Sequence, residues 1–278
     1  MLKLGQIIDD KYKILSVVGQ GGMSTVYKAV NIKLGNYWAV KEFIRKDILE
    51  KEVLILGKLK HQGLPMIVDV IKLDKQWYLI EEFIEGIPLS EIVNMKDPVK
   101  NDIVINWALQ LCQILKYLHF QRPNPIIYQD MKPSNVIIGH DGIVKLVDFG
   151  ISALRDSQYE KSGLGTKGYA APEQYKQSSE KIDKRTDIYG LGATLYHLVT
   201  QIKPKGIYSD DIKLLKSIKD YKELKNIINK SIEPNPHNRY QDISSLIDEI
   251  KNINKLAKGA RNHKKTFLTG KLFKKLKF

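Results

Sequence analysis

The spacing of hydrophobic residues in this sequence changes near Gly86 from strand-like runs to a helical repeat, and this change limits the folds that the chain can adopt. Before that residue, apolar-rich runs predict short strands at Tyr12 to Val18, Thr25 to Val30, Tyr37 to Phe43, Met66 to Leu73 and Gln76 to Ile80. One helix is expected among them, from Asp47 to Leu59. After Gly86 the period becomes helical, with apolar residues at Val104, Ala108, Leu111, Leu115 and Leu118. This order predicts an α+β fold with two lobes.

Length and composition agree with this organisation. A chain of 278 residues can form two lobes around a cleft. No stretch approaches the roughly 18 consecutive apolar residues that a membrane span needs, and the first ten residues lack an apolar signal region. Cys112 is the one cysteine, so an internal disulfide is excluded. These features predict a cytoplasmic protein. They do not predict its oligomeric state.

A glycine cluster separates the first two predicted strands. The segment Val18-Gly19-Gln20-Gly21-Gly22-Met23-Ser24-Thr25-Val26 could form an ordinary hairpin turn, or a turn whose backbone N–H groups approach phosphate oxygens. It is not a Walker-type loop, because no Gly-Lys-Ser/Thr follows and a strand comes next. Lys41 then ends the run Trp38-Ala39-Val40-Lys41, where a lysine is normally a solvated edge charge.

Together these two segments resemble the protein kinase family, whose signature is G-x-G-x-x-G-x-V followed by A-x-K. The resemblance implies a bilobal protein kinase fold with a small β-rich N-lobe and a larger α-helical C-lobe. We expect the N-lobe at residues 1–84, the C-lobe at 85–258 and a basic tail at 259–278. The resemblance also implies ATP as a ligand, although Ser24 replaces the third glycine.

A second pair of segments carries the chemistry. Tyr128-Gln129-Asp130-Met131-Lys132-Pro133-Ser134-Asn135 is followed by Asp148-Phe149-Gly150, where the family has H-R-D-x-x-x-x-N and then D-F-G. Phosphoryl transfer needs one carboxylate near the substrate hydroxyl, and a second carboxylate with an amide oxygen to hold Mg²⁺. Either segment alone could be an Asx-rich turn. Their combination, behind the glycine loop and Lys41, favours catalysis.

The resemblance assigns a role to each matching residue. Asp130, Lys132 and Lys41 are the expected catalytic residues, and Asn135 and Asp148 the expected ligands of Mg²⁺, with Mn²⁺ as a substitute. The expected nucleotide-binding residues are Val18, Gly19, Gly21, Gly22, Ser24, Val26, Ala39, Lys41, Glu52, Glu82, Ile84 and Ile137. Glu52 lies nine residues before His61 and is the expected partner of Lys41, with Glu50 as a solvated alternative.

Further segments resemble the structural parts of the same family. Thr166, in Gly-Thr-Lys-Gly-Tyr-Ala-Ala-Pro-Glu, is expected to brace Asp130 and Lys132. Glu173 is expected to pair with Arg239, and Asp187 to support the catalytic-loop backbone. Lys132 is typical of serine/threonine-specific members. The chain is therefore similar to the bacterial Hanks-type (eukaryotic-like) serine/threonine protein kinases, which implies protein substrates.

Two positions depart from the family pattern. Gln129 stands where an arginine usually gathers the phosphate of the activation loop, so we expect little dependence on phosphorylation there. Glu81 stands just before the hinge at Glu82 to Ile84, where a bulky apolar residue is usual, and could reach Lys41. A pseudokinase, binding nucleotide without turnover, is the rival hypothesis, and a small-molecule kinase is a second one. The residues expected to bind phosphate, to bind metal and to act as the base are all present, which argues against a pseudokinase.

The basic character is concentrated near the C-terminus. The net charge is +14, and the ten basic residues from Lys251 onward leave roughly +4 for the rest of the chain. Leu268, Leu272 and Leu276 are four apart among lysines, a pattern typical of a helix lying on an anionic membrane surface. Such contact would place the protein at the inner face of the membrane. A solubilising tail, nucleic-acid binding and docking on the protein itself are the alternatives.

Overall fold

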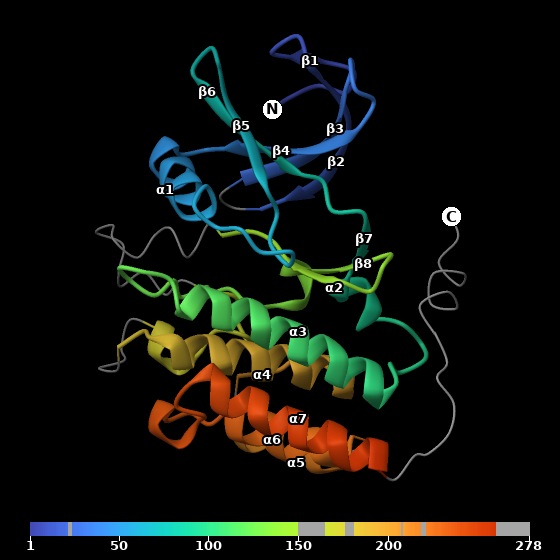
Figure 1. The fold of residues 1–278 in the computed structure, drawn as a ribbon, viewed down its shortest axis with the longest axis vertical. Helices are drawn as coiled ribbons and strands as arrows, with labels where there is room; N and C mark the ends of the chain where they lie inside the picture. The colour runs from blue at the N-terminus through green and yellow to red at the C-terminus, as the bar shows by residue number, and fades with distance from the viewer. Residues whose placement is uncertain (22–23, 150–164, 176–180, 207, 218–220, 260–278) are drawn as a thin grey trace.

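The computed structural model describes residues 1–21, 24–149, 165–175, 181–206, 208–217 and 221–259. In Figure 1 a sheet-rich part, shown in blue and cyan, lies above a helical part coloured green to red. The two parts are the N-lobe and C-lobe of a protein kinase fold, so the predicted α+β, bilobal class is confirmed. The exact lobe and tail boundaries remain predictions.

The N-lobe contains one antiparallel sheet in the strand order β1-β2-β3-β4-β6-β5. Its strands are Ile7–Ile8 (β1), Tyr12–Gln20 (β2), Ser24–Asn31 (β3), Tyr37–Phe43 (β4), Ile67–Leu73 (β5) and Gln76–Glu82 (β6). Helix α1, Lys46–Leu56, lies against the sheet. Ile48 and Leu49 are buried there with Phe43 and Leu79. This packing holds α1 beside β4, the strand that carries Lys41.

The C-lobe begins with a small sheet and continues in helices. Strands β7 (Gly86–Pro88), β8 (Val136–Gly139) and β9 (Val144–Leu146) form the sheet in that order. The helices are α2 (Leu89–Ile92), α3 (Asn101–His119), α4 (Lys184–Thr200), α5 (Tyr208–Ser217), α6 (Lys222–Ser231) and α7 (Ile243–Gly259). Single 3-10 turns occupy Pro133–Asn135, Pro172–Gln174 and Pro236–Asn238.

Two helices form the centre of the C-lobe core. In α3 the predicted apolar stripe from Val104 to Leu118 is buried. Helix α4 is buried nearly all round, as expected of a helix enclosed by other elements. Asp183 caps it, accepting a hydrogen bond from the Arg185 backbone N–H at 2.8 Å. This cap fixes the first turn of α4, which holds Asp187 close to the catalytic loop.

The sequence located the strongly periodic elements but missed the weaker ones. Helix α1 ends at Leu56 and not at Leu59, because Gly57 follows as its C-cap. Helices α2, α5 and α6 were not predicted, nor were strands β1 and β7. The β6 strand extends two residues beyond the predicted run and ends at Glu82. The missed elements are short or polar, and their burial depends on tertiary contacts.

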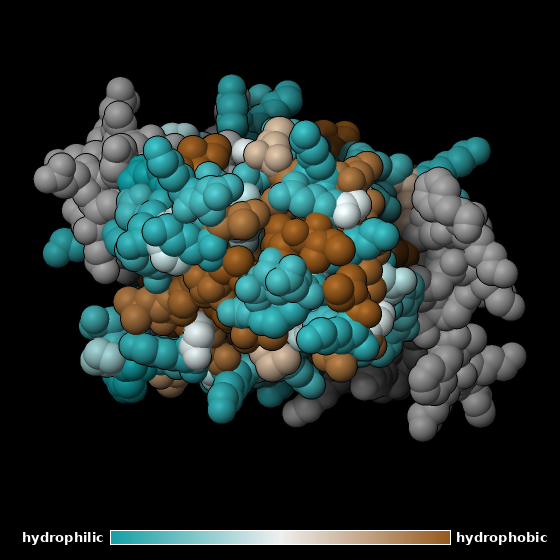
Figure 2. Space-filling model, turned by 90° about the horizontal axis from the view of Figure 1, so that it is seen from above, coloured by the Kyte–Doolittle hydropathy of each residue, from teal (hydrophilic) through white to brown (hydrophobic). Residues whose placement is uncertain are grey.

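The surface of the N-lobe is mixed in character. Seen from above, brown apolar areas lie between teal polar side chains (Figure 2). Leu4, Leu34 and Ile44 of the N-lobe are exposed. Single exposed apolar side chains are ordinary on soluble proteins. No helix within the described part of the chain has the length and apolar character needed to cross a bilayer. The basic segment 260–278 lies outside the described residues.

Candidate active site

The glycine loop connects β2 and β3. Gly19 pairs with Val26 across the two strands, and the Gly21 N–H donates to the Ser24 carbonyl oxygen at 2.9 Å. Val18 and Gly21 are exposed, whereas Val26 is half-buried. Gly22 lies outside the described residues. The described part of the loop is therefore a strand-to-strand turn held by one short backbone bond, as the sequence predicted.

Lys41 lies at the centre of a buried charge cluster. Its Nζ atom is 2.7 Å from Glu52 Oε1 on α1 and 2.8 Å from Asp148 Oδ1 in the C-lobe. Glu52 is the partner, as expected, and Glu50 instead pairs with Lys46 on the exposed face of α1. Burial disfavours the charge on Lys41, but the Asp148 and Glu52 carboxylates outweigh it and raise the Lys41 pKa. Lys41 therefore stays charged and links the two lobes.

Glu81 adds a third carboxyl group to this region. It is 7% exposed, and it lies opposite Ala39 in the register of β4 and β6, where Leu79 lies opposite Lys41. Lys41 and Glu81 are therefore diagonal neighbours on one face of the sheet. Burial raises the pKa of Glu81 to about 8, although Lys41 opposes the rise. The hydrogen bonds of Lys41 go to Glu52 and Asp148, so the suggested direct contact with Glu81 is absent among the described residues.

The catalytic loop gathers a second polar cluster. Asp130 Oδ2 accepts from Lys132 Nζ at 2.6 Å, and Asp130 Oδ1 accepts from Thr166 Oγ1 at 3.1 Å. Lys132 Nζ also lies 3.0 Å from Thr166 Oγ1, so the predicted brace is confirmed. Burial raises the pKa of Asp130, whereas Lys132 and Thr166 act in the opposite direction. Asn135 Nδ2 donates to Asp130 Oδ2 at 3.0 Å and ties the two ends of the loop together.

Asp187 holds the backbone of the catalytic loop from below. Its Oδ2 accepts from the Tyr128 N–H at 2.9 Å, and its Oδ1 accepts from the Gln129 N–H at 2.7 Å. The expected support is therefore present. His119, at the end of α3, adds a contact of 2.7 Å between its Nε2 and Asp187 Oδ2. Sequence reasoning missed His119, because nothing local connects residues 68 positions apart.

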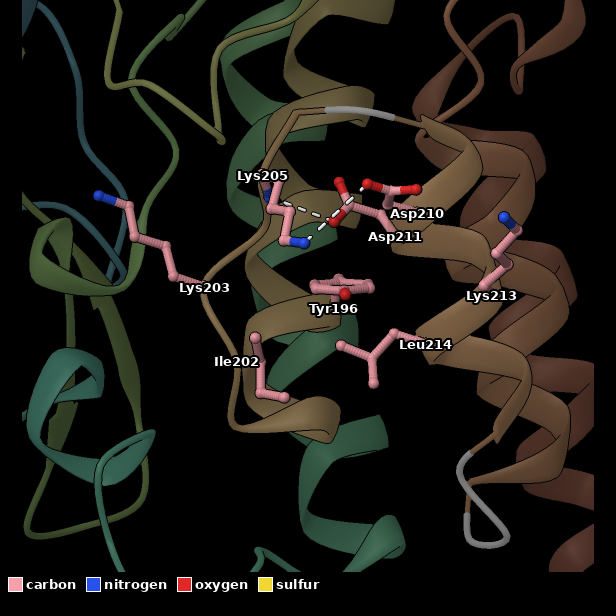
Figure 3. Close-up of a pocket in the computed structure, with 8 residues that line it drawn as sticks. All are labelled: Tyr196, Ile202, Lys203, Lys205, Asp210, Asp211, Lys213 and Leu214. Atoms are coloured by element: carbon pink, nitrogen blue, oxygen red, sulfur yellow. Dashed lines mark hydrogen bonds and ion pairs between the residues drawn. The ribbon is translucent and has the colours of Figure 1, made fainter.

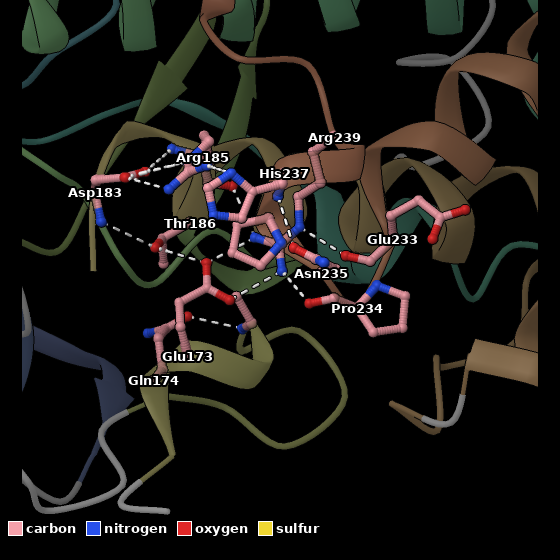
Figure 4. A network of polar contacts seen from close by, with 12 residues as sticks. Glu173, Gln174, Asp183, Arg185, Thr186, Glu233, Pro234, Asn235, His237 and Arg239 are labelled. Carbon is pink, nitrogen blue, oxygen red and sulfur yellow. Dashed lines mark hydrogen bonds and ion pairs between the residues drawn. The ribbon is translucent and has the colours of Figure 1, made fainter. Parts of the chain in front are cut away.

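A further network fixes the end of the segment that contains Thr166 (Figure 4). Arg239 Nη1 and Nη2 donate to the two carboxylate oxygens of Glu173 at 2.6 and 2.9 Å. Both side chains are buried, with exposed fractions of 0% and 1%. Thr186 Oγ1 also donates to Glu173, at 2.9 Å. The predicted Glu173–Arg239 pair is confirmed, and it ties this segment to α4 and to the turn before α7.

The remaining nucleotide-site candidates lie around the junction of the lobes. Ala39 is buried in β4, Ile137 lies in β8, and Glu82 ends β6 just before Ile84. The carboxylate of Glu82 pairs with Lys145 Nζ of β9 at 2.8 Å, a contact that the sequence did not predict. The predicted adenine contacts of Glu82 and Ile84 remain predictions.

The donor set suits a hard divalent cation shared with phosphates. The Asp148 side chain is 45% exposed, although Lys41 pairs with one of its oxygens. The amide nitrogen of Asn135 donates to Asp130, so the amide oxygen Oδ1 of Asn135 points away from Asp130. Within the described ranges, no group of three or more His, Cys, Asp or Glu side chains could hold a metal alone. Mg²⁺ commonly binds through one or two protein oxygens plus substrate phosphates, so these residues fit that mode.

Tyr128 fills the position where the family usually has histidine. Its ring is fully buried and meets Phe149 edge to face, with the ring centroids 5.1 Å apart. Its hydroxyl donates to the Val147 carbonyl oxygen at 2.5 Å. The aromatic pair holds the residue just after Asp148 against the catalytic loop.

Comparison with known proteins identifies the family. Residues 12–261 match the protein kinase domain family, so the chain belongs to this family. The chain is 31% identical over 91% of its length to a probable serine/threonine-protein kinase of Clostridium perfringens, and 30% identical over 89% to serine/threonine-protein kinase PrkC of Bacillus subtilis. It spans 39% and 41% of the length of these two relatives.

The fold has solved counterparts. The crystal structure of the Mycobacterium tuberculosis PknI kinase domain aligns with a TM-score of 0.67 over 91% of this chain and 99% of that chain. The identity is 20%, so this likeness supports the fold alone. The family implies ATP and a protein as substrates, usually with a divalent metal ion.

Proposed function

We propose that this protein is an ATP-dependent serine/threonine protein kinase, which transfers the γ-phosphate of ATP to protein hydroxyl groups and also phosphorylates itself. The observation that carries the proposal is the contact of Lys41 with both Glu52 and Asp148. These contacts join the two lobes, and protein kinases need this lysine–glutamate pair, together with a metal ion on the aspartate that corresponds to Asp148, for phosphoryl transfer.

The catalytic loop supplies the residues for the acceptor hydroxyl. Asp130 is buried, and a raised pKa suits a carboxylate that orients the hydroxyl and accepts its proton. Lys132 lies beside it and would neutralise the charge of the transferring phosphoryl group. Asn135 and Asp148 would hold Mg²⁺, with Mn²⁺ as a substitute, and the ion would neutralise phosphate charge. Lys132 is typical of kinases that phosphorylate serine and threonine, and Thr166, which it contacts, lies in the segment that favours protein substrates.

A pseudokinase remains the competing function, and one assay separates the two. Wild-type protein is incubated with radiolabelled ATP and Mg²⁺, alone and with a generic basic protein. We expect label on both proteins. Asp130→Asn and Asp148→Asn should each abolish the label, because no other residue can replace Asp130 in accepting the proton or Asp148 in binding the metal. Lys41→Ala should reduce it severely.

Two results would decide against the proposal. Near-normal transfer by Asp148→Asn would refute the mechanism. ATP binding without any transfer by the wild type would instead favour the pseudokinase.

The tail, residues 259–278, is proposed to bind an anionic membrane surface. The support is its sequence, in which lysines alternate with leucine and phenylalanine. Each lysine near such a surface contributes roughly 1 kcal/mol at low salt. This contact would keep a cytoplasmic kinase at the inner face of the membrane. Nucleic-acid binding is the weaker alternative, since the basic residues alternate with apolar ones.

A further inference from the structure

The loop of residues 201–206, between α4 and α5, packs tightly on the end of the segment that contains Thr166. Gly168 has a φ of +93°, and a Cβ atom there would lie 2.2 Å from the Pro204 carbonyl oxygen. The backbones therefore approach more closely than any side chain would allow. On the neighbouring residue, Tyr169, the hydroxyl lies 2.6 Å from His197 Nδ1 of α4. The loop is thus a fixed extension of the surface next to the catalytic loop.

A pocket of about 500 Å³ lies between this loop and α5 (Figure 3). Tyr196, Ile202 and Leu214 supply apolar walls. Ile202 is 46% exposed, so part of this wall faces solvent. The pocket has room for an apolar side chain and is not used by the proposed catalytic residues.

Positive charge surrounds the pocket and extends toward the catalytic loop. Lys205 and Lys213 line it, and Lys203 points away from Lys213, with its Nζ 5.9 Å from the centre of the Tyr169 ring (Figure 3). Lys167, between Thr166 and Gly168, is exposed as well. Three lysines therefore line the pocket, and Lys167 precedes Gly168, which packs on Pro204 of the loop.

The two acidic residues of the pocket offset part of this charge, and the lining keeps one more lysine than aspartates. Asp211 is buried, and its oxygens accept the backbone N–H groups of Lys205 and Gly206, each at 3.1 Å. Asp210 lies 3.9 Å from Lys205 Nζ, and both of these side chains are largely exposed. Such an exposed pair is weak and can be replaced by a better carboxylate partner.

The loop lies within reach of a peptide held at the catalytic aspartate. Asp130 contacts Thr166 at 3.1 Å, and Gly168 follows two residues later, at most about 7 Å along the chain. Gly206 in turn packs on Gly168, since a Cβ atom on Gly206 would lie 3.6 Å from Gly168 Cα. The separation of Asp130 from the loop is thus on the order of 10–15 Å, the span of about three to five residues of extended peptide.

We propose that the loop 201–206 and its pocket form a docking subsite for an acidic segment of the protein substrate. A carboxylate three to five residues from the acceptor hydroxyl pairs with Lys203 or with Lys205, whose ammonium groups point to opposite sides of the loop (Figure 3), and an apolar neighbour enters the pocket beside Ile202. This inference rests on the proposed kinase function and names the class of substrate that the site prefers.

The test uses the full chain and a set of peptides. Each peptide has one serine in a neutral background and one glutamate, which is moved through the positions on either side. The matched peptide has glutamine at the same position. At one position, three to five residues from the serine, glutamate should raise kcat/KM about fivefold, the effect of one or two exposed ion pairs. Lys203→Gln combined with Lys205→Gln should remove this preference and leave kcat/KM for the all-glutamine peptide unchanged.

Controls separate a specific site from general attraction. Lys251→Gln removes an equally exposed charge on α7 and should leave the glutamate preference intact. Lys203→Glu with Lys205→Glu should reverse the preference, so that lysine in the peptide outperforms glutamate. In peptides with leucine or glutamine next to the glutamate, Ile202→Gln should reduce the advantage of leucine over glutamine. Equal kcat/KM for glutamate and glutamine at every position, or a preference that the double variant retains, would overturn the proposal.

Failure of the docking subsite and failure of the kinase function give different results. If the wild type phosphorylates the peptides without a preference for glutamate, the docking subsite is refuted and the kinase function is supported. If the wild type labels no peptide at all, the kinase function fails. Docking is then read from fluorescence anisotropy with labelled peptides in which alanine replaces the serine. Equal dissociation constants for the glutamate and glutamine peptides would exclude the subsite in that case too.

Discussion

Removing the guanidinium of Arg239 should destabilise the whole C-lobe. This group makes two hydrogen bonds to Glu173, and it also donates to the backbone carbonyl oxygens of Glu233, Pro234 and Arg185 at 2.7, 3.0 and 3.1 Å. Arg239→Met keeps much of the apolar volume. It leaves the Glu173 carboxylate buried with the Thr186 hydroxyl as its remaining donor in Figure 4.

The expected cost follows from that burial. Breaking a buried ion pair by removing one partner typically costs about 3 to 5 kcal/mol, because the other charge is left uncompensated. A domain of this size has a total stability of about 5 to 15 kcal/mol. The melting temperature should therefore fall by roughly 10 °C. Adding Glu173→Gln to Arg239→Met removes the stranded charge and should restore at least about 1 kcal/mol.

Urea unfolding followed by circular dichroism measures these differences. The matched control is Lys46→Met, which breaks an ion pair whose two side chains are 53% and 59% exposed. That variant should lose less than about 0.5 kcal/mol. The reasoning is refuted if Arg239→Met costs no more than the control. It is also refuted if Glu173→Gln adds its full separate cost in the double variant, since the stranded charge would then carry no penalty.

Three further predictions concern regulation, location and pH. Because Gln129 carries no charge, phosphatase treatment and the double substitution of two activation-loop serines, Ser157→Ala with Ser162→Ala, should each change the initial rate less than tenfold. Both serines lie outside the described residues, and a larger loss in both experiments would contradict this. In co-sedimentation with vesicles rich in anionic lipid, the full chain should bind more tightly than a chain ending at Lys258, and equal binding would exclude a membrane role for the tail. The stability of the Glu81→Gln variant relative to the wild type should increase from about pH 5 to pH 8. Between the ordinary glutamate pKa and the raised value of about 8, the folded wild type holds a proton that the unfolded chain has lost, so wild-type stability falls as pH rises. If the urea midpoints of the wild type and Glu81→Gln differ by the same amount at pH 5.5 and at pH 8, Glu81 is already ionised in the folded protein.

Much of the candidate site could be predicted because its residues form short local patterns. Asp130 and Asn135 are five residues apart and Lys41 ends an apolar strand, and the match of these short segments to the protein kinase signature selected them. The choice of Glu52 over Glu50 is also a local matter. These two side chains face opposite sides of α1, and Glu52 lies on the side that is buried against the sheet.

Other features depend on contacts that no local pattern records. Helix α6 begins at Lys222, and its N-cap residue Tyr221 has a φ of 59° and makes no side-chain capping hydrogen bond. The helix is fixed by burial of Leu224, Ile227 and Ile228. The pairing of Glu82 with Lys145 joins residues 63 positions apart. The possibility that Glu81 reaches Lys41 is met only at longer range, because the Lys41 ammonium makes its hydrogen bonds to Glu52 and Asp148 and acts on Glu81 through its charge.

The contacts of Gln129 explain why an arginine is not needed to position the catalytic loop. The Gln129 backbone has a φ of 68°, a strained value for a residue with a side chain, so other contacts must hold it. Its N–H donates to Asp187, and its carbonyl oxygen accepts from Gln174 Nε2 at 2.9 Å. Its own side-chain Nε2 is buried and has no hydrogen-bond partner among the described residues. The loop is thus held through the backbone of residue 129 by groups anchored in the C-lobe, and these contacts are the physical basis for the prediction that activity depends little on phosphorylation.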